Sequence, residues 1–303
     1  MSGKILITGG TGLVGTRLSE MLIDQGYDVA HLSRHPDKFS KYKTFKWDIH
    51  KSYIDENAIT WADYIINLAG ANVSEGKWTD ERKKEIRDSR VLSTQLLVQY
   101  LQNHTQHVKA LISTSAIGIY GNTGEILISE ETSPGEDFLA ELCKEWEQAA
   151  LKANALGIRT VIFRTGIVLS DKGGALPQIA KPIKLMAGAP LGTGKQYMSW
   201  IHIDDLCRLF VKAIEEPAFS GTYNAVAPHP VTNEEFTKKL ADVMHRPLVL
   251  PNVPAFALNL VLGEMSEVVL GGSRVSPNKV MHKGFTFEYS YLDEALESFY
   301  SQA

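Results

Sequence analysis

Residues 4–15 read Lys-Ile-Leu-Ile-Thr-Gly-Gly-Thr-Gly-Leu-Val-Gly, a short apolar run followed by glycines at a spacing of three. The apolar residues 5–7 suit a buried parallel strand. Residues 13–26 carry apolar side chains at helical spacing, and Gly26 is a plausible end for that helix. The chain therefore begins with a strand, a glycine turn and a helix, the order that binds a dinucleotide in a doubly wound α/β fold.

Each glycine of this turn has a physical reason. Gly9 permits the tight turn, Gly12 lets backbone N–H groups approach a pyrophosphate, and Gly15 lets the helix pack close to the strand. The N-terminus of the helix adds partial positive charge for the phosphates. A glycine-rich turn in some other α/β protein is the alternative, but the position after the first strand favours a dinucleotide. The predicted contacts in this turn are Gly9, Thr11, Gly12, Leu13 and Val14.

The end of the second strand bears on the choice of cofactor. That strand is predicted over residues 27–32, and Ser33 and Arg34 follow it. At this position a carboxylate favours NAD by accepting from the ribose 2′-OH, whereas an arginine can pair with the 2′-phosphate of NADP. The first carboxylate here is Asp37. We therefore expect NADP(H) to be preferred over NAD(H), with Ser33 and Arg34 at the phosphate; a solvated loop arginine is the alternative.

Strands alternate with helices through the first half of the chain, which predicts a Rossmann fold with a doubly wound parallel sheet. After Arg164 the alternation stops, and 170–174 form a glycine-rich loop. We expect residues 1–168 to form the NAD(P)-binding domain, to which 198–227 return, and 169–303 to form a smaller C-terminal α/β lobe that closes a substrate cleft. The predicted strands are 43–47, 63–68, 108–113, 158–163, 198–203 and 222–224, and the predicted helices are 79–103, 138–156, 204–215, 232–244 and 256–262.

Charge and composition exclude several classes of function. A net charge of −4 over 303 residues gives no electrostatic case for nucleic acid or an anionic membrane. No apolar segment approaches the roughly 20 residues that span a bilayer, and the first strand starts at Lys4, so a cytoplasmic protein without a signal peptide is expected. Cys143 and Cys207 form no CxxC pair, and no cluster has metal-ligand spacing. We expect no metal and a small-molecule substrate.

Short motifs spread along the chain are residues 8–15, Asp48, 67–70, 89–90, 113–116, 120–121, 138–147, 164–169 and 200–206. Together they resemble the extended short-chain dehydrogenase/reductase superfamily. Within it the chain is most similar to the atypical subgroup of NAD-dependent (sugar-nucleotide) epimerase family proteins, which have a characteristic small C-terminal domain. The resemblance covers essentially the whole chain, but it is far less specific for the reaction than for the fold. Superfamily members often dimerise through two long helices, and the sequence neither supports nor excludes a homodimer.

The resemblance implies a particular set of catalytic groups. Enzymes of the superfamily use a tyrosine as acid or base, a lysine four residues later that lowers the tyrosine pKa, and a serine that holds the substrate oxygen. The proton on that oxygen must move in step with the hydride. Ser115 matches the serine and Lys144 matches the lysine, but Ala140 stands where the tyrosine belongs. Alanine has no proton to give, so the usual mechanism cannot run unchanged.

Three readings of this site stay open. In the first, another group replaces the tyrosine, with Tyr120 the nearest candidate and His202 or Glu141 behind it. In the second, Lys144 binds the nicotinamide ribose and an activated water manages the proton. In the third, the chain binds NADP and a ligand without turnover, as a sensor or regulator, and some members of the subgroup carry a cell-division label. The plainer alternatives are packing for Tyr120 and a solvated helix surface for Lys144.

Further contacts are expected where strands end, because ligands of doubly wound sheets lie at the carboxyl ends of the strands. Arg164 could pair there with a substrate anion. For His202 the plainer alternative is a buried histidine that forms a hydrogen bond with a carbonyl oxygen. For Arg90 the plainer alternative is a position on a solvated helix face. The remaining predicted cofactor contacts are Asp48, Leu68, Ala69, Gly70, Arg90 and Lys144, and the predicted substrate contacts are Asn72, Arg164, Trp200 and His202.

Overall fold

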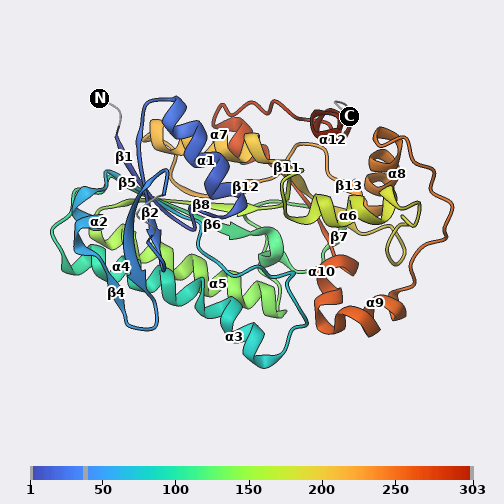
Figure 1. Cartoon of the computed structure of the whole chain (residues 1–303), viewed down its shortest axis with the longest axis horizontal. Coiled ribbons are helices and arrows are strands. Elements are labelled where there is room, and N and C mark those ends of the chain that lie inside the picture. The colour runs from blue at the N-terminus through green and yellow to red at the C-terminus, as the bar shows by residue number, and fades with distance from the viewer. Residues whose placement is uncertain (1–2, 37–39, 301–303) are drawn as a thin grey trace.

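The computed structural model describes residues 3–36 and 40–300, and Asp37 lies outside them. Its central element is an eight-stranded sheet with the order β12-β8-β6-β5-β1-β2-β3-β4 (Figure 1). All neighbouring strands are parallel except β3 and β4. The strands are β1 (Lys4–Thr8), β2 (Asp28–Ser33), β3 (Lys43–Asp48), β4 (Tyr53–Ile54), β5 (Tyr64–Asn67), β6 (Ala110–Ala116), β8 (Arg159–Thr165) and β12 (Gly221–Ala225).

The strand order reverses between β1 and β5, which are neighbours in the sheet but far apart in the chain. In a doubly wound fold this reversal marks the crevice in which ligands bind, outside the carboxyl ends of the strands. The glycine turn after β1 lies at this crevice. The predicted Rossmann sheet is therefore confirmed, and the reversal places the functional site.

Helices cover both faces of the sheet (Figure 1). One core contains Ile5 and Ile7 of β1 together with residues of α7, and the other contains Leu6 with residues of α4. This alternation follows from the pleat of a strand, and both faces are apolar because both are buried. The covering helices are α1 (Leu13–Asp24) and α7 (Ile203–Glu215) on the first face, and α2 (Glu56–Trp61), α4 (Val91–Asn103) and α5 (Phe138–Leu151) on the second.

The predicted helix over 79–103 is wrong in one respect, because the segment forms two helices, α3 (Asp80–Asp88) and α4. The break lies at Ser89 and Arg90. Ser89 Oγ donates to the carbonyl oxygen of Ile86 and accepts from the backbone N–H of Ala71. Side-chain bonds to the backbone compete with helical ones, so this link to the loop after β5 coincides with the end of α3.

The C-terminal part forms a third core, in which Trp200 packs with residues of α6 (Ala175–Lys184), α8 (Asn233–Val243) and α12 (Leu292–Tyr300). The helix predicted from Thr232 starts there with a complete capping box to Glu235. The strand predicted over 198–203 is divided into β10 (Tyr197–Met198) and β11 (Trp200–His202). The sequence did not predict the partners of these two strands, the other small strand pair or the short helices near the C-terminus. These are β9 (Ile167–Leu169) beside β11, β13 (Val231–Thr232) beside β10, β7 (Gly124–Ile128) with β14 (Ser273–Val275), and the helices α10 (Ser266–Leu270) and α11 (Asn278–His282).

The segment predicted as a helix near 256–262 is α9 (Ala255–Leu262), and several of its apolar side chains are exposed. Within the part of the chain that the structure describes, no helix has both the length and the apolar character needed to cross a bilayer.

Candidate functional site

The glycine turn connects β1 to α1 at the crevice of the sheet. Gly9 has a positive φ of 68°, and a Cβ there would lie 2.9 Å from the backbone of Leu68. A Cβ on Gly15 would collide with the carbonyl oxygen of Gly9. Gly12 is exposed and is the N-cap of α1, with no side-chain cap from any described residue. The uncapped N–H groups at the positive end of α1 therefore fit the pyrophosphate of a dinucleotide.

A buried hydrogen-bond cluster fixes the end of β5 next to this turn. Thr8 Oγ1 donates to Asn67 Oδ1 across 2.7 Å, and it accepts from the backbone N–H groups of Leu68 and Ala69 at 3.1 Å each. These bonds bring the predicted cofactor contacts Leu68 and Ala69 beside the turn. Gly70 follows and is exposed.

Arg90 holds the loop after β5 through hydrogen bonds to backbone carbonyl oxygens. Its guanidinium donates to the carbonyl oxygens of Ile86 and Ala71 at 3.0 and 2.9 Å. A Cβ on Gly70 would lie 2.9 Å from Arg90 Cζ, so a side chain there would displace the guanidinium from its present position. Burial lowers the pKa of Arg90 to about 10. Arg90 is half-buried and positions the backbone of this loop, and its predicted contact with the cofactor stays a prediction.

At the end of β2, Ser33 is half-buried and Arg34 is exposed. Ser33 Oγ accepts from the backbone N–H of His35 across 3.2 Å, which turns the chain at this point. Arg34 is thus placed at the strand end where the 2′-phosphate was predicted. Asp48 ends β3 and accepts from the backbone N–H groups of His50 and Lys51, so it holds a turn.

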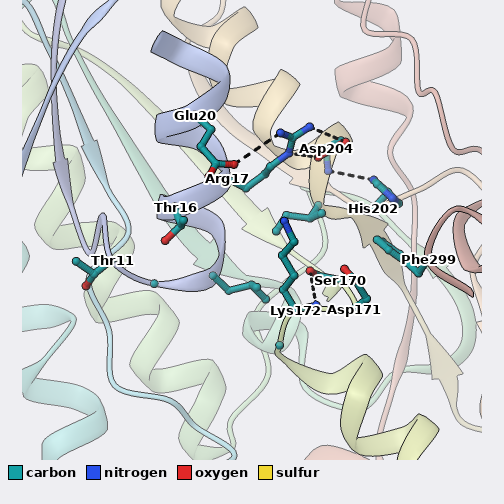
Figure 2. Close-up of a pocket in the computed structure, with 14 residues that line it drawn as sticks. Thr11, Thr16, Arg17, Glu20, Ser170, Asp171, Lys172, His202, Asp204 and Phe299 are labelled. Carbon is teal, nitrogen blue, oxygen red and sulfur yellow. Dashed lines mark hydrogen bonds and ion pairs between the residues drawn. The ribbon is translucent and has the colours of Figure 1, made fainter. Parts of the chain in front are cut away.

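A cavity of about 620 Å³ opens beside the glycine turn (Figure 2). Thr11, Gly12 and Leu13 line one side, and residues 170–173, which follow β9, line another. The start of α7 closes the cavity, where Arg17 Nε and Nη2 bond to the two carboxylate oxygens of Asp204 at 2.6 and 3.0 Å. The cavity is therefore walled on one side by the predicted pyrophosphate contacts and on the other by charged side chains.

Ser115 belongs to a buried network. Its hydroxyl donates to Glu147 Oε1 across 2.7 Å. Arg164 holds the same carboxylate through Nε and Nη2, each at 2.9 Å, and its Nη1 donates to the Tyr120 hydroxyl at 2.9 Å. Tyr120 in turn donates to Asn224 Oδ1 across 2.7 Å. The network thus links β6, the turn after it, α5, β8 and β12 through the base of the crevice.

This network changes the interpretation of two predicted residues. Arg164 is only 9% exposed and its guanidinium is occupied by Glu147, Tyr120 and the carbonyl oxygen of Glu130, so the prediction of a substrate-anion contact is wrong here. Tyr120 is 3% exposed, and burial raises its pKa. With its hydroxyl in two hydrogen bonds, Tyr120 has no free proton for a ligand in this conformation. The packing alternative fits Tyr120 better than the acid–base role.

Lys144 and Ala140 lie one turn apart on α5. Lys144 is half-buried and pairs with Glu141. Ala140 is fully buried, and its backbone N–H donates to Asp137, the N-cap of the helix. Position 140 is therefore enclosed by protein as well as lacking a proton donor.

Trp200 differs from expectation, whereas His202 lines the cavity and its predicted contact with substrate stays a prediction. Trp200 is fully buried, and its indole donates to the carbonyl oxygen of His229 at 3.2 Å, so the prediction that it touches substrate is wrong. His202 caps α7 by accepting from the Asp204 N–H through Nδ1. Its ring stacks between Tyr289 and Phe299, with centroids 3.7 and 4.6 Å away. Burial lowers the His202 pKa to about 4, so at neutral pH the ring is an uncharged edge of the cavity.

Asn72 lies apart from these groups. It is exposed, and its side-chain oxygen accepts from the N–H and the hydroxyl of Ser74, which makes a local turn. Its predicted contact with substrate stays a prediction. Among residues 3–36 and 40–300, no group of three or more His, Cys, Asp or Glu side chains is arranged to hold a metal ion.

Comparison with known proteins gives the family. Residues 5–226 match the NAD dependent epimerase/dehydratase family, and residues 253–299 match a domain of unknown function called DUF1731. The chain belongs to the NAD-dependent epimerase/dehydratase family. The resemblance inferred from the motifs, including the small C-terminal domain, is confirmed.

Relatives in this family match over nearly the full length of the chain. The epimerase family protein YfhF of Bacillus subtilis is 40% identical over 295 residues, which are 97% of this chain and 96% of that protein. The chloroplastic SDR39U1 homolog of Arabidopsis thaliana is 39% identical, over 97% of this chain and 86% of that protein. A crystal structure of human SDR39U1 with NADPH has a TM-score of 0.88 at 29% identity, covering 99% of this chain and 100% of that one.

Sequence reasoning assigned no individual role to Glu147 or Lys172, although Glu147 closes the motif 138–147. Glu147 stands three residues after Lys144, so helical spacing alone could have placed it on the same side of α5. Its partner Arg164 lies 17 residues away in another element, and no local pattern joins the two. Lys172 was part of a loop described only by its glycines.

Proposed function

We propose that this chain is an NADP(H)-binding oxidoreductase or epimerase-like enzyme of the extended short-chain dehydrogenase type, acting on a small polar or nucleotide-linked substrate. The observation that carries the proposal is the glycine turn at the uncapped N-terminus of α1, with Gly12 exposed at its tip. Side chains larger than glycine at Gly9 and Gly15 would occupy the space that the turn needs. The NADPH found with the human relative supports the same cofactor here.

The preference for NADP(H) over NAD(H) rests on the end of β2. Arg34 is exposed there and Ser33 precedes it. A guanidinium can form paired hydrogen bonds with a phosphate, whereas a ribose hydroxyl at this position is usually met by a carboxylate. Arg34 would therefore gain more from the 2′-phosphate of NADP(H) than from the hydroxyl of NAD(H).

The bound nicotinamide would supply hydride chemistry, and the chain's own residues would place the substrate and manage the proton. Lys144 is the remaining member of the usual tyrosine–lysine pair and is the residue suited to hold the nicotinamide ribose. Ser115 directs its proton to Glu147, so it can only accept a hydrogen bond from a ligand. With Tyr120 occupied and position 140 an alanine, a water molecule is the proton carrier that this arrangement favours.

A second candidate function is a non-catalytic NADPH sensor or regulator. The closed network of Ser115, Glu147, Arg164 and Tyr120 favours it, because each of these polar groups is satisfied by protein. A regulator needs tight cofactor binding but no free acid or base at the nicotinamide.

The two candidates are separated by turnover. Purified protein loaded with NADPH is mixed with a panel of ketones, aldehydes and nucleotide sugars, and NADPH fluorescence is followed in single-turnover conditions. The enzyme proposal predicts oxidation of NADPH by at least one class. Tight binding with no oxidation by any class would favour the regulator. The Lys144→Met variant is measured in the same way, and it should oxidise NADPH more slowly if Lys144 orients the ribose.

A further inference from the structure

Lys172 lies in the loop that faces the tip of α1. This loop, residues 170–173, follows β9 and lines the same 620 Å³ cavity as Thr11, Gly12 and Leu13. Figure 2 shows the Lys172 side chain extending from the loop beside the start of α1, in the direction of the Arg17–Asp204 pair. The lysine thus shares a cavity with the backbone that is proposed to bind a pyrophosphate.

The loop has a defined position against α1. The backbone N–H of Lys172 donates to Ser170 Oγ across 3.2 Å, which makes a tight turn. Gly174 has a φ of 76°, and a Cβ there would lie 3.2 Å from a methyl group of Leu13. Leu13 is the first residue of α1. The two glycines after Lys172 therefore let the loop rest directly on the start of the dinucleotide-binding helix.

The other charges in the cavity leave Lys172 as the cation available to an anion. Arg17 is held by Asp204 through two short bonds and lies 3.9 Å from Glu20. Asp171 is exposed next to Lys172. Within the part of the chain that the structure describes, Lys172 itself forms no ion pair within 4.0 Å. The cavity thus holds the carboxylates of Glu20, Asp171 and Asp204 against the cations Arg17 and Lys172. Arg17 is bound directly to Asp204, and the charge of Lys172 also helps to lower the Asp204 pKa from a longer distance.

The glycine turn itself supplies no charged side chain, since residues 8–15 are glycine, threonine, leucine and valine. A pyrophosphate carries two negative charges, whereas a helix N-terminus offers only about half a positive charge. We propose that Lys172 is the counter-charge of the dinucleotide pyrophosphate, closing over it from the loop after β9. This inference rests on the proposed NADP(H) binding and deepens it by assigning a phosphate-binding residue outside the Rossmann turn.

The test compares ligands that differ in the pyrophosphate. Wild type, Lys172→Ala and Lys172→Gln are titrated calorimetrically with NADPH, NADH and adenosine 2′-monophosphate, which lacks both phosphates of the pyrophosphate. Loss of one charge-assisted contact should weaken the binding of NADPH and of NADH by about tenfold each, and it should leave the binding of the monophosphate unchanged. Lys181→Ala is the matched control, because Lys181 is an exposed lysine on α6 outside the cavity.

Two results would overturn the inference. One is an NADPH affinity of Lys172→Ala and Lys172→Gln equal to that of wild type. The other is an equal loss for adenosine 2′-monophosphate, which would place Lys172 at the 2′-phosphate or show a general disturbance. If wild type binds NADPH and the variants give one of these two results, this inference fails but the proposed function stands. Wild type that binds none of the three ligands contradicts the proposed function and this inference together.

Discussion

The Ser115 hydroxyl donates to Glu147 Oε1 across 2.7 Å, so the residue that matches the superfamily serine gives its proton to a buried carboxylate. Toward any ligand, Ser115 then presents only lone pairs. Ser115 is 2% exposed, so a substrate would reach it only if the site opened, and it would then have to offer a hydroxyl or an amine rather than a bare carbonyl. The departure of this site from the superfamily pattern lies at Ala140, which stands where the tyrosine is expected.

The Glu147–Arg164 pair should be a major contributor to stability. Both side chains are about nine-tenths buried, and removal of one partner leaves the other charge unpaired. Glu147→Ala is expected to lower the free energy of unfolding by about 3 to 5 kcal/mol. The measurement is urea unfolding at pH 7. Glu145→Ala on the same helix is the control, because its pair with Arg87 is exposed and should cost under about 1 kcal/mol. Equal losses for both variants would contradict this account.

Substitutions of two glycines of the turn should affect different properties, cofactor binding at Gly12 and stability at Gly15. Gly12→Val should weaken NADPH binding by more than about tenfold but cost less stability than Gly15→Val. Gly12 is exposed with an extended backbone, and a Cβ there would lie 3.2 Å from the Gly9 carbonyl oxygen, compared with 2.4 Å at Gly15. Gly15→Val should lower the free energy of unfolding by about 1 to 3 kcal/mol or more, because its side chain would collide with Gly9. Titration and urea unfolding are measured on both. Normal NADPH binding by Gly12→Val would argue against a pyrophosphate at the tip of α1.

Stability should fall as the pH is lowered below neutrality. Burial lowers the pKa of His31 and His202 to about 4 each, below the ordinary value of about 6.5. The unfolded chain therefore takes up protons between these values while the folded chain does not. Each histidine should lower the free energy of unfolding by about 2 kcal/mol between pH 7 and pH 5. His202→Gln should lessen this loss by that amount, and His35→Gln, an exposed control, should not. A pH dependence unchanged in His202→Gln would refute the assignment.

Restoring a tyrosine at position 140 should not restore the usual mechanism. Ala140 is fully buried, so Ala140→Tyr overpacks the site and should cost about 1 to 3 kcal/mol of stability. Gln148→Tyr, at an exposed position of the same helix, should be close to neutral. Urea unfolding and single-turnover NADPH oxidation are compared. A stable Ala140→Tyr protein with much faster oxidation would show that the pocket opens and that Ser115 and Lys144 are placed as in the superfamily.

The sequence was sufficient for the Rossmann sheet and the glycine turn, because both depend on local signals. Apolar runs marked the strands, and the spacing of Gly9, Gly12 and Gly15 marked the turn. The break at Ser89 was not predictable in the same way, since it depends on a bond to Ala71 in a distant loop.

The candidate site was predicted only in part, because some of its residues depend on local signals and others on contacts with distant elements. The residues at the strand ends were correctly located, but the partners of Arg164, Tyr120 and Trp200 come from other elements. Spacing along the chain predicts which side of an element a residue occupies, whereas burial and pairing depend on tertiary contacts. That is why Arg164 was expected to face substrate and instead lies in an internal ion pair.

NADPH and NADH titrations of wild type and Arg34→Ala test the central claim most directly. The account predicts that wild type binds NADPH at least about tenfold more tightly than NADH, a difference of about 1.4 kcal/mol. Arg34→Ala should lose most of that preference while binding NADH as before. Equal binding of the two cofactors by wild type would remove Arg34 from the 2′-phosphate. Binding of neither would contradict a dinucleotide site at the glycine turn.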